Sequence, residues 1–427
     1  MHLDILALLA CLLPLPQRSQ VALESQGPGV SEIVDEMIIA LEPSTTPGAV
    51  VRGTSLVPSA AASDCAVGKR LHLFHVPSDL SVSERSELLA EVQARPGVEF
   101  AEWNWTASSP DVARCELGVG ATAVGCTQAF YDGNPSEESY SQQPLVQEIG
   151  ADFAHRELGD LTVVVAVIDT GVDLAHPALD GYLIGDGYDF LTGNPQGWDL
   201  ANGVDDDLDG LVDEAYGHGT HVSSTIALIN PNARILPLRV LDSDGNGTAF
   251  QVAQAIRFAV RSGAAVINLS LTLSSRSVAV VQALEIARDQ GVQVVAAAGN
   301  TGSAHVAFPA RYPTVFAIAS VGFDERRSPF SAYGEAVSMS APGAGIYGAM
   351  PDGQFAWWSG TSMASAVATG SLSLTHSLCA SMMSSISPER ALLTTCLQIE
   401  AFNPDEEGLL GEGRVDLRSA TQTIRHP

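Results

Sequence analysis

Residues 162–173 have the sequence TVVVAVIDTGVD, in which an unbroken apolar run ends at an aspartate and a glycine turn. A short continuous run of β-branched residues before a turn is typical of a strand that is buried on both faces. Four further apolar runs follow, at residues 234–241, 265–271, 292–298 and 314–320. Strands of this kind alternate with helices in α/β proteins. The pattern therefore predicts a doubly wound parallel sheet with helices on both faces.

Two amphipathic helices are expected between these strands. Residues 248–262 place apolar side chains at helical spacing and end before Gly263, and a second helical pattern spans residues 277–290. Sheets of this class bind ligands beyond the carboxyl ends of their strands. Asp169 and Asn300 both follow predicted strand ends, so we expect them to lie at a functional edge.

A smaller unit precedes the main pattern, at residues 30–105. Its helix at residues 82–94 begins with a capping box, and its strand-like apolar runs lie at residues 37–41, 71–76 and 98–103. This order predicts a small α+β domain. Residues 106–145 are rich in Ser, Pro, Gly and Gln and lack periodicity, which predicts a linker and an N-terminal arm before a main domain at residues 146–427.

The first 25 residues predict a signal peptide. The apolar run at residues 3–15 is too short to cross a bilayer but long enough for a signal core. No Lys or Arg precedes it, and LLAC at residues 8–11 leaves a lipoprotein-type signal open. No other segment is predicted to span a membrane, so we expect a secreted protein, either extracellular or in the cell envelope.

Composition narrows the range of partners. The chain has 427 residues and a formal net charge of −28, and Lys69 is its single lysine. Nucleic acids and anionic membranes would both repel such a surface, so neither is expected as a partner. A chain of this length also exceeds what one core usually supports, in agreement with two folded units.

Six cysteines suit an oxidising compartment. Two close pairs, Cys115 with Cys126 and Cys379 with Cys396, are candidate disulfides, which leaves Cys65 unpaired. Both members of the second pair lie in helical patterns where a small apolar residue also fits, so buried free thiols are the alternative there.

Three motifs supply an Asp, a His and a Ser in that order: VIDTGVD at residues 167–173, GHGTHV at 217–222 and GTSMA at 360–364. A serine hydroxyl needs a base to remove its proton, and histidine has a suitable pKa. We expect His218 to activate Ser362 and Asp169 to orient the imidazole.

Simpler roles remain open for these residues. Asp169 and Ser362 are also possible helix caps. His218 and His221 offer a metal pair, but their spacing differs from HExxH and the segment lacks a glutamate, so His221 is expected to be a packed helix residue.

The motif order and the sequences around it resemble the subtilisin-like serine proteases, or subtilases. AAAGN at residues 296–300 is similar to the oxyanion segment of that family, and APG at 341–343 is similar to the loop before its serine. The resemblance covers nearly the whole chain. It implies that the Asn300 amide and the Ser362 backbone N–H hold the oxyanion, although Asn300 is also a possible turn residue.

The resemblance also implies a substrate-binding edge, because NLSL at residues 268–271 is similar to the strand that pairs with the substrate backbone. The expected binding residues are Asn268, Ser270, Leu271, Thr272, Ala298 and Gly299. The sequence departs from the family at Thr272 and Leu273, where glycines are common, and at Ala366, where proline is usual. Side-chain preference is therefore not inherited from the resemblance.

GVEFAEWNW at residues 97–105 resembles the closing strand of a subtilase propeptide. The resemblance implies a zymogen whose own propeptide assists folding and blocks the active site with its C-terminal tail. We expect the chain to cleave itself between Trp105 and Cys115, at the start of the linker.

The loop DDDLDGLVDE carries carboxylates at alternating positions with a glycine at the turn, as calcium loops do. The candidate ligands are Asp205, Asp207, Asp209, Asp213 and Glu214. The position of the last EF-hand ligand is Tyr216, so the loop resembles the shorter calcium loops of some subtilases. A solvated acidic loop is the alternative. No organic cofactor is expected.

The sequence thus predicts a secreted, calcium-assisted serine endopeptidase that acts on protein or peptide substrates through an acyl-enzyme on Ser362. One alternative is an aspartic-type protease that uses the DTG motif of Asp169 as a homodimer, because the chain has no second such motif. The other is a non-catalytic secreted binding protein on a protease fold.

Overall fold

The computed structural model describes residues 32–42, 44–59, 71–111, 129–131 and 136–426. The expected signal peptide, Cys65 and the pair Cys115 and Cys126 lie outside these residues. Among the described residues, no helix combines the length and apolar character that crossing a bilayer requires.

The main domain is built on a parallel sheet of seven strands. In spatial order the strands are β13 (Val337–Pro342), β12 (Phe316–Val321), β11 (Gln293–Ala297), β9 (Val266–Leu269), β5 (Val163–Asp169), β7 (Ala233–Arg239) and β6 (Tyr188–Asp189). Five of them, β5, β7, β9, β11 and β12, confirm the strands predicted from apolar runs. The sheet also gains β6 and β13 at its edges, which the sequence analysis did not predict.

Helices cover both faces of this sheet, which confirms the doubly wound α/β class. The helices α8 (Ala249–Arg261) and α9 (Val278–Asp289) pack on one face, and α7 (His218–Ile229) and α10 (Thr361–Met382) pack on the other. Side chains alternate along a strand. Thus Ala166 and Ile168 of β5 join the first core, whereas Val165 and Val167 join the second.

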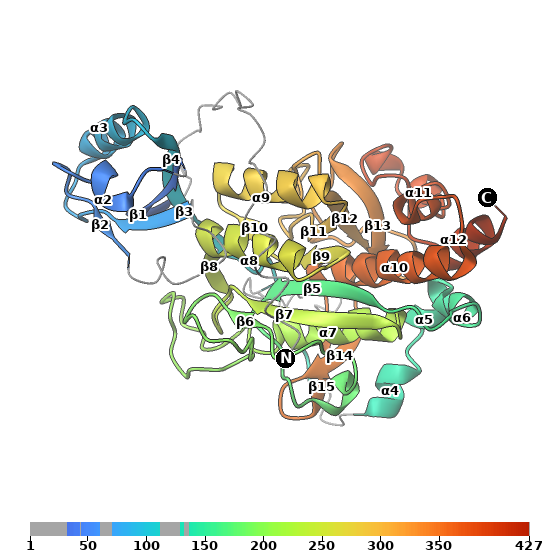
Figure 1. Cartoon of the computed structure of the whole chain (residues 1–427). Coiled ribbons are helices and arrows are strands. Elements are labelled where there is room, and N and C mark those ends of the chain that lie inside the picture. The colour runs from blue at the N-terminus through green and yellow to red at the C-terminus, as the bar shows by residue number, and fades with distance from the viewer. Residues whose placement is uncertain (1–31, 43, 60–70, 112–128, 132–135, 427) are drawn as a thin grey trace, which may run out of the picture.

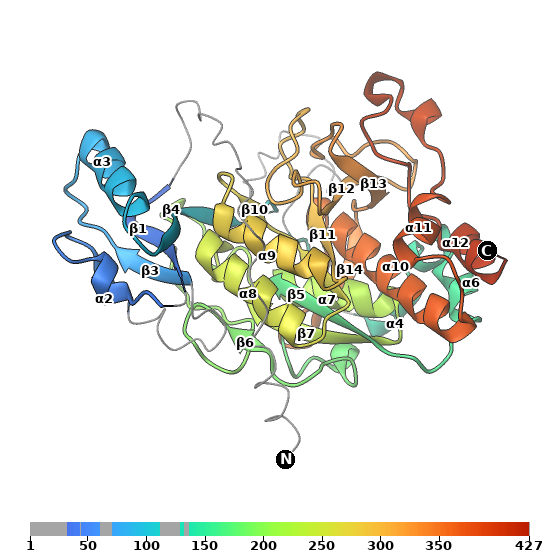
Figure 2. The same cartoon turned by 45° about the horizontal axis from the view of Figure 1, so that its top comes forward.

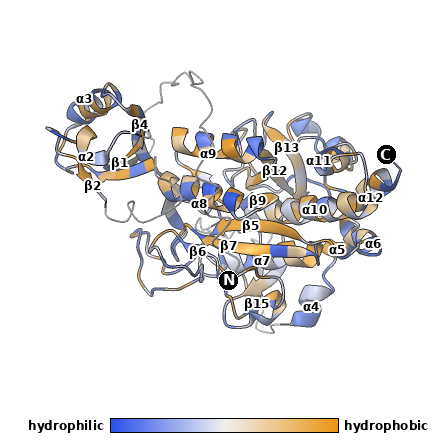
Figure 3. Cartoon of the chain, viewed as in Figure 1, coloured by the Kyte–Doolittle hydropathy of each residue, from blue (hydrophilic) through white to orange (hydrophobic). Residues whose placement is uncertain are grey.

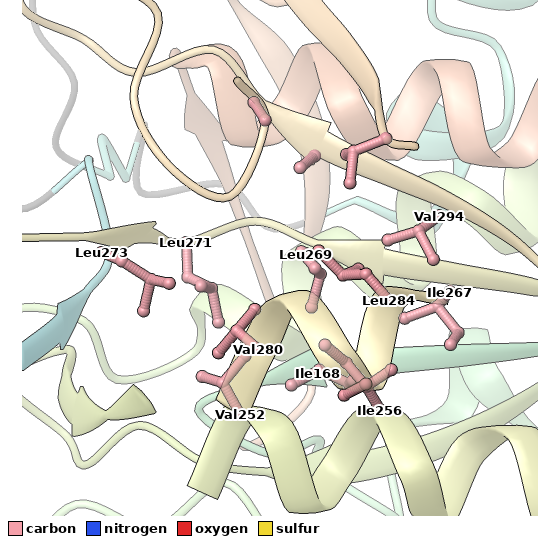
Figure 4. Close-up of a cluster of buried hydrophobic side chains, with 14 of the residues drawn as sticks. Ile168, Val252, Ile256, Ile267, Leu269, Leu271, Leu273, Val280, Leu284 and Val294 are labelled. Atoms are coloured by element: carbon pink, nitrogen blue, oxygen red, sulfur yellow. The ribbon is translucent and has the colours of Figure 1, made fainter. Parts of the chain in front are cut away.

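The pictures show this arrangement directly. In Figures 1 and 2, α8 and α9 lie side by side across the central strands. Figure 3 shows the central strands β5 and β7 as largely hydrophobic. Figure 4 shows Ile168 next to Val252 and Ile256 of α8, with Val280 and Leu284 of α9 beside them. The apolar face predicted for the helix at residues 248–262 is therefore the face that packs against the sheet.

A smaller antiparallel unit precedes the main domain and lies at one end of the molecule (Figures 1 and 2). It consists of β1 (Glu32–Leu41), α2 (Pro47–Val50), β2 (Val57–Pro58), β3 (Leu71–His75), α3 (Val82–Gln93) and β4 (Val98–Ser108). The predicted capping box at the start of α3 is present. The apolar side chains of this smaller unit form a separate core between its sheet and α3.

The strand β4 is longer than predicted and joins the two units. Beyond residue 103 it continues to Ser108 and pairs with two short strands of the main domain, β8 (Asn246–Thr248) and β10 (Thr272–Leu273). The Glu102 carboxylate accepts hydrogen bonds from the Val278 N–H at 2.8 Å and the Ala279 N–H at 2.9 Å. A carboxylate is favourable at a helix N-terminus, so this contact docks the small unit onto α9.

The remaining elements flank the sheet. A two-stranded hairpin of β14 (Ile346–Met350) and β15 (Gln354–Trp358) packs near α7. The short helices are α4 (Glu137–Ser141), α5 (Leu145–Glu148), α6 (Ala151–His155), α11 (Pro388–Leu393) and α12 (Leu417–Arg425), and the 3-10 turns are Pro177–Leu179, Glu400–Phe402 and Pro404–Glu406.

Of the two possibilities left open for Cys379 and Cys396, the structure has buried free thiols, so the candidate disulfide between them is not formed. Cys379 lies in the last turns of α10, and both thiols belong to the same apolar core. The Cys396 thiol donates to the Leu392 carbonyl at 3.5 Å. Burial raises the pKa of Cys379 to about 11 and that of Cys396 to about 12, so both stay protonated at neutral pH. Spacing in sequence did not distinguish paired cysteines from packed ones.

This assignment predicts that both thiols react only after unfolding, because the apolar core excludes the reagent and disfavours the thiolate. Iodoacetamide should leave Cys379 and Cys396 unlabelled in the native protein and label both in denaturant without any reductant. Peptide mass spectrometry reads the result. A peptide pair linked through these two cysteines would contradict it.

Candidate active site

Asp169 and His218 meet at the carboxyl edge of the sheet. Asp169 is the last residue of β5, and His218 is the first residue of α7. The His218 Nδ1–H donates to Asp169 Oδ1 at 2.7 Å, and both side chains are buried. Gly219 makes the approach possible, because a Cβ there would overlap the Gly171 carbonyl and contact the Asp169 side chain. The hydrogen bond fixes the tautomer and orientation of the imidazole.

Two carboxylates determine the charge of His218. Burial on its own would lower the pKa of His218, but the charges and hydrogen bonds of Asp169 and Asp111 outweigh it and raise the pKa to about 10. His221, one turn along α7, behaves in the opposite way: burial and then the charge of His218 lower its pKa to about 3. Its Nε2 lies 3.1 Å from the Ile346 carbonyl, as expected for a packed, neutral histidine.

Ser362 lies in the first turn of α10 and is buried. Its Oγ–H donates to the Ser270 carbonyl at 3.4 Å. The positive end of the helix dipole favours negative charge at this position. The serine is therefore placed at the same sheet edge as Asp169 and His218.

Asn300 lies at the same edge, beside the cleft between β8 and β10 that holds residues 106–111, and its amide is held in one orientation. Its Oδ1 accepts from the Thr361 N–H at 3.0 Å and from the Thr361 hydroxyl at 2.8 Å. The Thr361 oxygen in turn accepts from the Gly299 N–H at 3.1 Å. The amide nitrogen is left to point into the cleft, where it donates to the Pro110 carbonyl at 3.0 Å.

The segment 106–111 fills this cleft, and its residues up to Ser108 are the end of β4. It is held between β8 and β10, with Ser108 opposite Thr272 and Ala107 opposite Gly247. The Ser109 N–H donates to the Gly245 carbonyl at 2.8 Å. Main-chain pairing on both sides is how peptides add to sheet edges. The segment thus brings the Pro110 carbonyl to Asn300 within the chain itself.

The expected substrate-binding residues divide into two groups. Thr272 pairs with the segment, Ser270 offers its carbonyl to Ser362, and Gly299 is fixed beside Asn300. Leu271, Ala298 and Asn268 instead face the interior. The Asn268 side chain donates to the Ser270 hydroxyl at 2.9 Å and accepts from the Thr369 hydroxyl at 2.8 Å. It therefore holds Ser270 in position from the protein interior.

Two buried aspartates belong to the site although the sequence analysis did not assign them. Asp111 contacts both His218 and Asn300. Asp199 accepts from the Gly217 N–H at 3.1 Å and the Thr220 hydroxyl at 3.0 Å, which anchors the start of α7. Burial raises the pKa of Asp199 to about 8. A lone aspartate in a loop carries no sequence signal for either role.

The acidic loop precedes α7 and brings only part of the predicted ligand set together. Carboxylate oxygens of Asp205, Asp207 and Asp209 lie within 4.8 Å of one another. Asp213 instead accepts from the backbone N–H groups of residues 202 and 203. Burial, and then nearby carboxylates, raise the pKa of Glu214 to about 7, and its Oε2 is buried with no hydrogen-bond partner among the described residues.

The sequence of the chain is similar to the sequences of known proteins. Over 211 residues the chain is 42% identical to the thermophilic serine proteinase of Bacillus sp. (strain AK1), a match that covers 47% of this chain and 49% of that protein. It is 33% identical over 287 residues to subtilisin BL of Lederbergia lenta, covering 65% of this chain and 97% of that protein. The chain thus spans about half of the first relative and nearly all of the second.

A solved structure agrees in fold. Fervidolysin from Fervidobacterium pennivorans, described as a keratinolytic enzyme related to subtilisin, superposes with a TM-score of 0.68 at 22% identity and covers 93% of this chain and 62% of that one. The model of the subtilase family matches residues 160–413, which include Asp169, His218, Asn300 and Ser362. The chain therefore belongs to the subtilase family of subtilisin-like serine proteases.

Proposed function

We propose that this chain is the precursor of a secreted serine endopeptidase that hydrolyses peptide bonds through an acyl-enzyme on Ser362. One observation carries the proposal: an extended peptide segment of the chain lies in the cleft with its Pro110 carbonyl 3.0 Å from Asn300 Nδ2. That carbonyl is presented to an oxyanion donor at the edge that holds His218 and Ser362.

The proposed chemistry follows from the positions of these groups. The Ser362 oxygen attacks a substrate carbonyl carbon while its proton passes to His218 Nε2, and Asp169 stabilises the imidazolium that forms. The Asn300 amide and the Ser362 N–H stabilise the oxyanion. His218 then gives the proton to the leaving amine, and water hydrolyses the ester. An aspartic mechanism is disfavoured because Asp169 is already engaged by His218 at 2.7 Å.

Protein and peptide chains are the proposed substrates. The cleft binds residues 106–109 through main-chain hydrogen bonds to β8, to β10 and to the Gly245 carbonyl. Such bonds do not depend on side chains, so they suit polypeptides of varied sequence. Ala107 is fully buried, which supports a small apolar residue three positions before the residue whose carbonyl faces Asn300.

The N-terminal unit is proposed to be a propeptide that follows a signal peptide and inhibits the enzyme in cis. Its support is the course of β4, which leaves the small sheet and enters the cleft without a break in its pairing. The carbonyl presented to Asn300 belongs to Pro110, between Trp105 and Cys115, so self-cleavage in that interval remains the proposal. Export fits the acidic surface charge and the predicted signal.

A structural calcium ion is proposed at the acidic loop. The three clustered carboxylates fit the hard oxygen ligands that calcium prefers. The ion would be held by Asp205, Asp207 and Asp209 and would neutralise their repulsion. No step of the triad chemistry needs it, so its role is to order the loop ahead of α7.

Replacing Ser362 tests the nucleophile. Ser362→Ala should fold but lose peptide hydrolysis by roughly 10⁶-fold, the scale seen when a subtilisin loses its serine, and it should remain a full-length precursor. Peptide hydrolysis and gel mobility measure this. Ser371→Ala is the matched control, because it removes a buried hydroxyl from the same helix, where Ser371 donates to Val367 at 2.8 Å. Comparable turnover by Ser362→Ala would overturn the assignment.

Thr361→Val tests whether the orientation of Asn300 matters. The variant removes the hydroxyl that bonds Asn300 Oδ1 at 2.8 Å, so kcat should fall by about tenfold, equivalent to one hydrogen bond, with KM little changed. Thr375→Val on the same helix is the control, because its hydroxyl bonds Leu372 at 2.7 Å, away from the cleft. An unchanged kcat, or a rise in KM alone, would contradict an oxyanion role.

Removing calcium should lower stability, because an ion that binds only the folded state stabilises it by about 2.7 kcal/mol at a hundredfold excess over its Kd. We expect chelator to lower the Tm of the wild type. Asp207→Asn with Asp209→Asn should show the lower Tm without chelator and respond little to it.

Asp160→Asn with Asp180→Asn is the charge-matched control, since both residues are exposed and outside the loop. Differential scanning calorimetry with and without calcium provides the measurement. A Tm of the wild type that ignores calcium, or a loop variant that responds like the wild type, would remove the site from this loop.

A further inference from the structure

The side chain of Asp111 lies inside the catalytic constellation. Its Oδ2 is 2.9 Å from His218 Nε2, and its Oδ1 accepts from the Asn300 amide nitrogen. Both Asp111 and His218 are completely buried. Ser362 Oγ, the group that His218 Nε2 must deprotonate, bonds the Ser270 carbonyl instead. The carboxylate thus occupies the base and the oxyanion donor together.

We propose that Asp111 is an inhibitory residue of the precursor, whose carboxylate holds His218 in the imidazolium form and occupies Asn300, so that self-cleavage waits until this side chain leaves. The proposal rests on the proposed serine protease function and adds to it: the backbone of the tail occupies the cleft, but a charged side chain next to the presented carbonyl disables the base.

The local structure is shaped to receive this carboxylate. Gly360 lies beside it, and a Cβ at that position would overlap Asp111 Oδ1. The Asp111 N–H donates to the Ser109 hydroxyl at 3.4 Å, so the chain turns back after Pro110 and directs the side chain into the site. Pro110 itself lacks an N–H. A residue with a shorter or larger side chain would not make both contacts.

The charges around His218 explain why the contact is inhibitory. The groups that face it are Asp111 from the tail, Asp169 from β5, Asp199 from the preceding loop and His221 on α7. Asp169 and Asp111 contact opposite ring nitrogens. An imidazole with a carboxylate at each nitrogen carries both protons, so it cannot accept another from Ser362. Burial strengthens this pairing, because no water competes for either ion.

The cleavage step shows what must change. For the bond between Pro110 and Asp111 to break, His218 must first give its Nε2 proton to the Asp111 carboxylate as that side chain leaves, and then turn to Ser362. Ser362 Oγ then bonds to the Pro110 carbonyl carbon, its proton passes through His218 to the Asp111 nitrogen, and that C–N bond breaks. Water later releases the acyl group from Ser362. The attack by Ser362 and the steps after it each require the carboxylate to have left Nε2.

The first test compares the rate at which purified full-length chains convert to a shorter form at neutral pH. Asp111→Asn keeps the shape but removes the charge, and Asp111→Ala removes both contacts. Both variants should convert at least about tenfold faster than the wild type, a change of about 1.4 kcal/mol in barrier. Asp79→Asn is the control, because Asp79 is an exposed acid of the same N-terminal unit. Equal or slower conversion of both Asp111 variants would overturn the proposal.

The second test does not depend on proteolysis. In full-length Ser362→Ala, the imidazole signals of isotope-labelled histidine report the protonation of His218, assigned by their loss in His218→Gln. We expect Asp111→Asn in this background to lower the pKa of His218 by at least about one unit, whereas Asp79→Asn leaves it unchanged. Identical titration with and without Asp111→Asn would refute the ion pair.

The two tests also separate this proposal from the proposed function. A chain that never converts and hydrolyses no peptide, yet shows the Asp111-dependent shift of His218, would retain the ion pair and refute the protease. A chain that matures and hydrolyses peptides without the shift would retain the protease and refute the role of Asp111.

Discussion

The hydrogen bond between Asp169 and His218 sets the geometry on which the site depends. It joins the end of the central strand β5 to the start of α7, so it forms only if the sheet and that helix meet at the carboxyl edge. Gly219 permits the close approach, and Asp199 anchors the helix start from the other side. A parallel sheet supplies this edge because all its strands end there. Packing on both faces of the sheet therefore fixes the positions of β5 and α7, and with them the 2.7 Å hydrogen bond between Asp169 and His218.

The same edge holds the chain's own segment 106–111, and we propose that a substrate binds there in the same way. β8 and β10 lie on either side of the segment 106–111, and both bind it through the backbone. This main-chain pairing does not depend on which side chains are present, so sequence specificity and inhibition must come from side-chain contacts. The contact made by Asp111 is a carboxylate that competes with Ser362 for His218. The segment that joins the small unit to the main domain is thus also the segment that we propose regulates it.

Much of this architecture was predictable from local patterns. Apolar runs marked the strands β5, β7, β9, β11 and β12. Helical spacing of apolar residues, with a glycine after the last turn, marked α8 and α9. A short stretch of sequence is enough to show both patterns. The contact between Asp169 and His218 was predictable because strand ends and helix starts share one edge of such a sheet. Ser362 lies at the same edge, but its hydroxyl bonds the Ser270 carbonyl and not His218. The edge strands β6 and β13 were not predicted: β6 has only two residues, and β13 alternates serine with apolar residues.

The remaining features depend on contacts between distant segments, which no window of sequence contains. Residues 106–111 lack periodicity, so no local pattern predicted that β4 extends into the cleft, and the resemblance to the family alone implied that a tail lies there. Cys379 and Cys396 are close in sequence but are free in the core, because an apolar site accepts a thiol as readily as a disulfide. Asn268 belongs to the expected motif, yet its side chain supports Ser270 from the interior. Asp111 and Asp199 acquire their roles only from the surroundings that folding gives them.

The proposed mechanism requires Ser362 to be an activated nucleophile in the mature protein. The most direct measurement is reaction of the mature form with a fluorophosphonate probe, followed by peptide mass spectrometry to locate the adduct. The proposed mechanism predicts one stoichiometric adduct, on Ser362, that disappears when His218 is replaced. Absence of an adduct in protein that hydrolyses peptides, or an adduct on another residue, would contradict it.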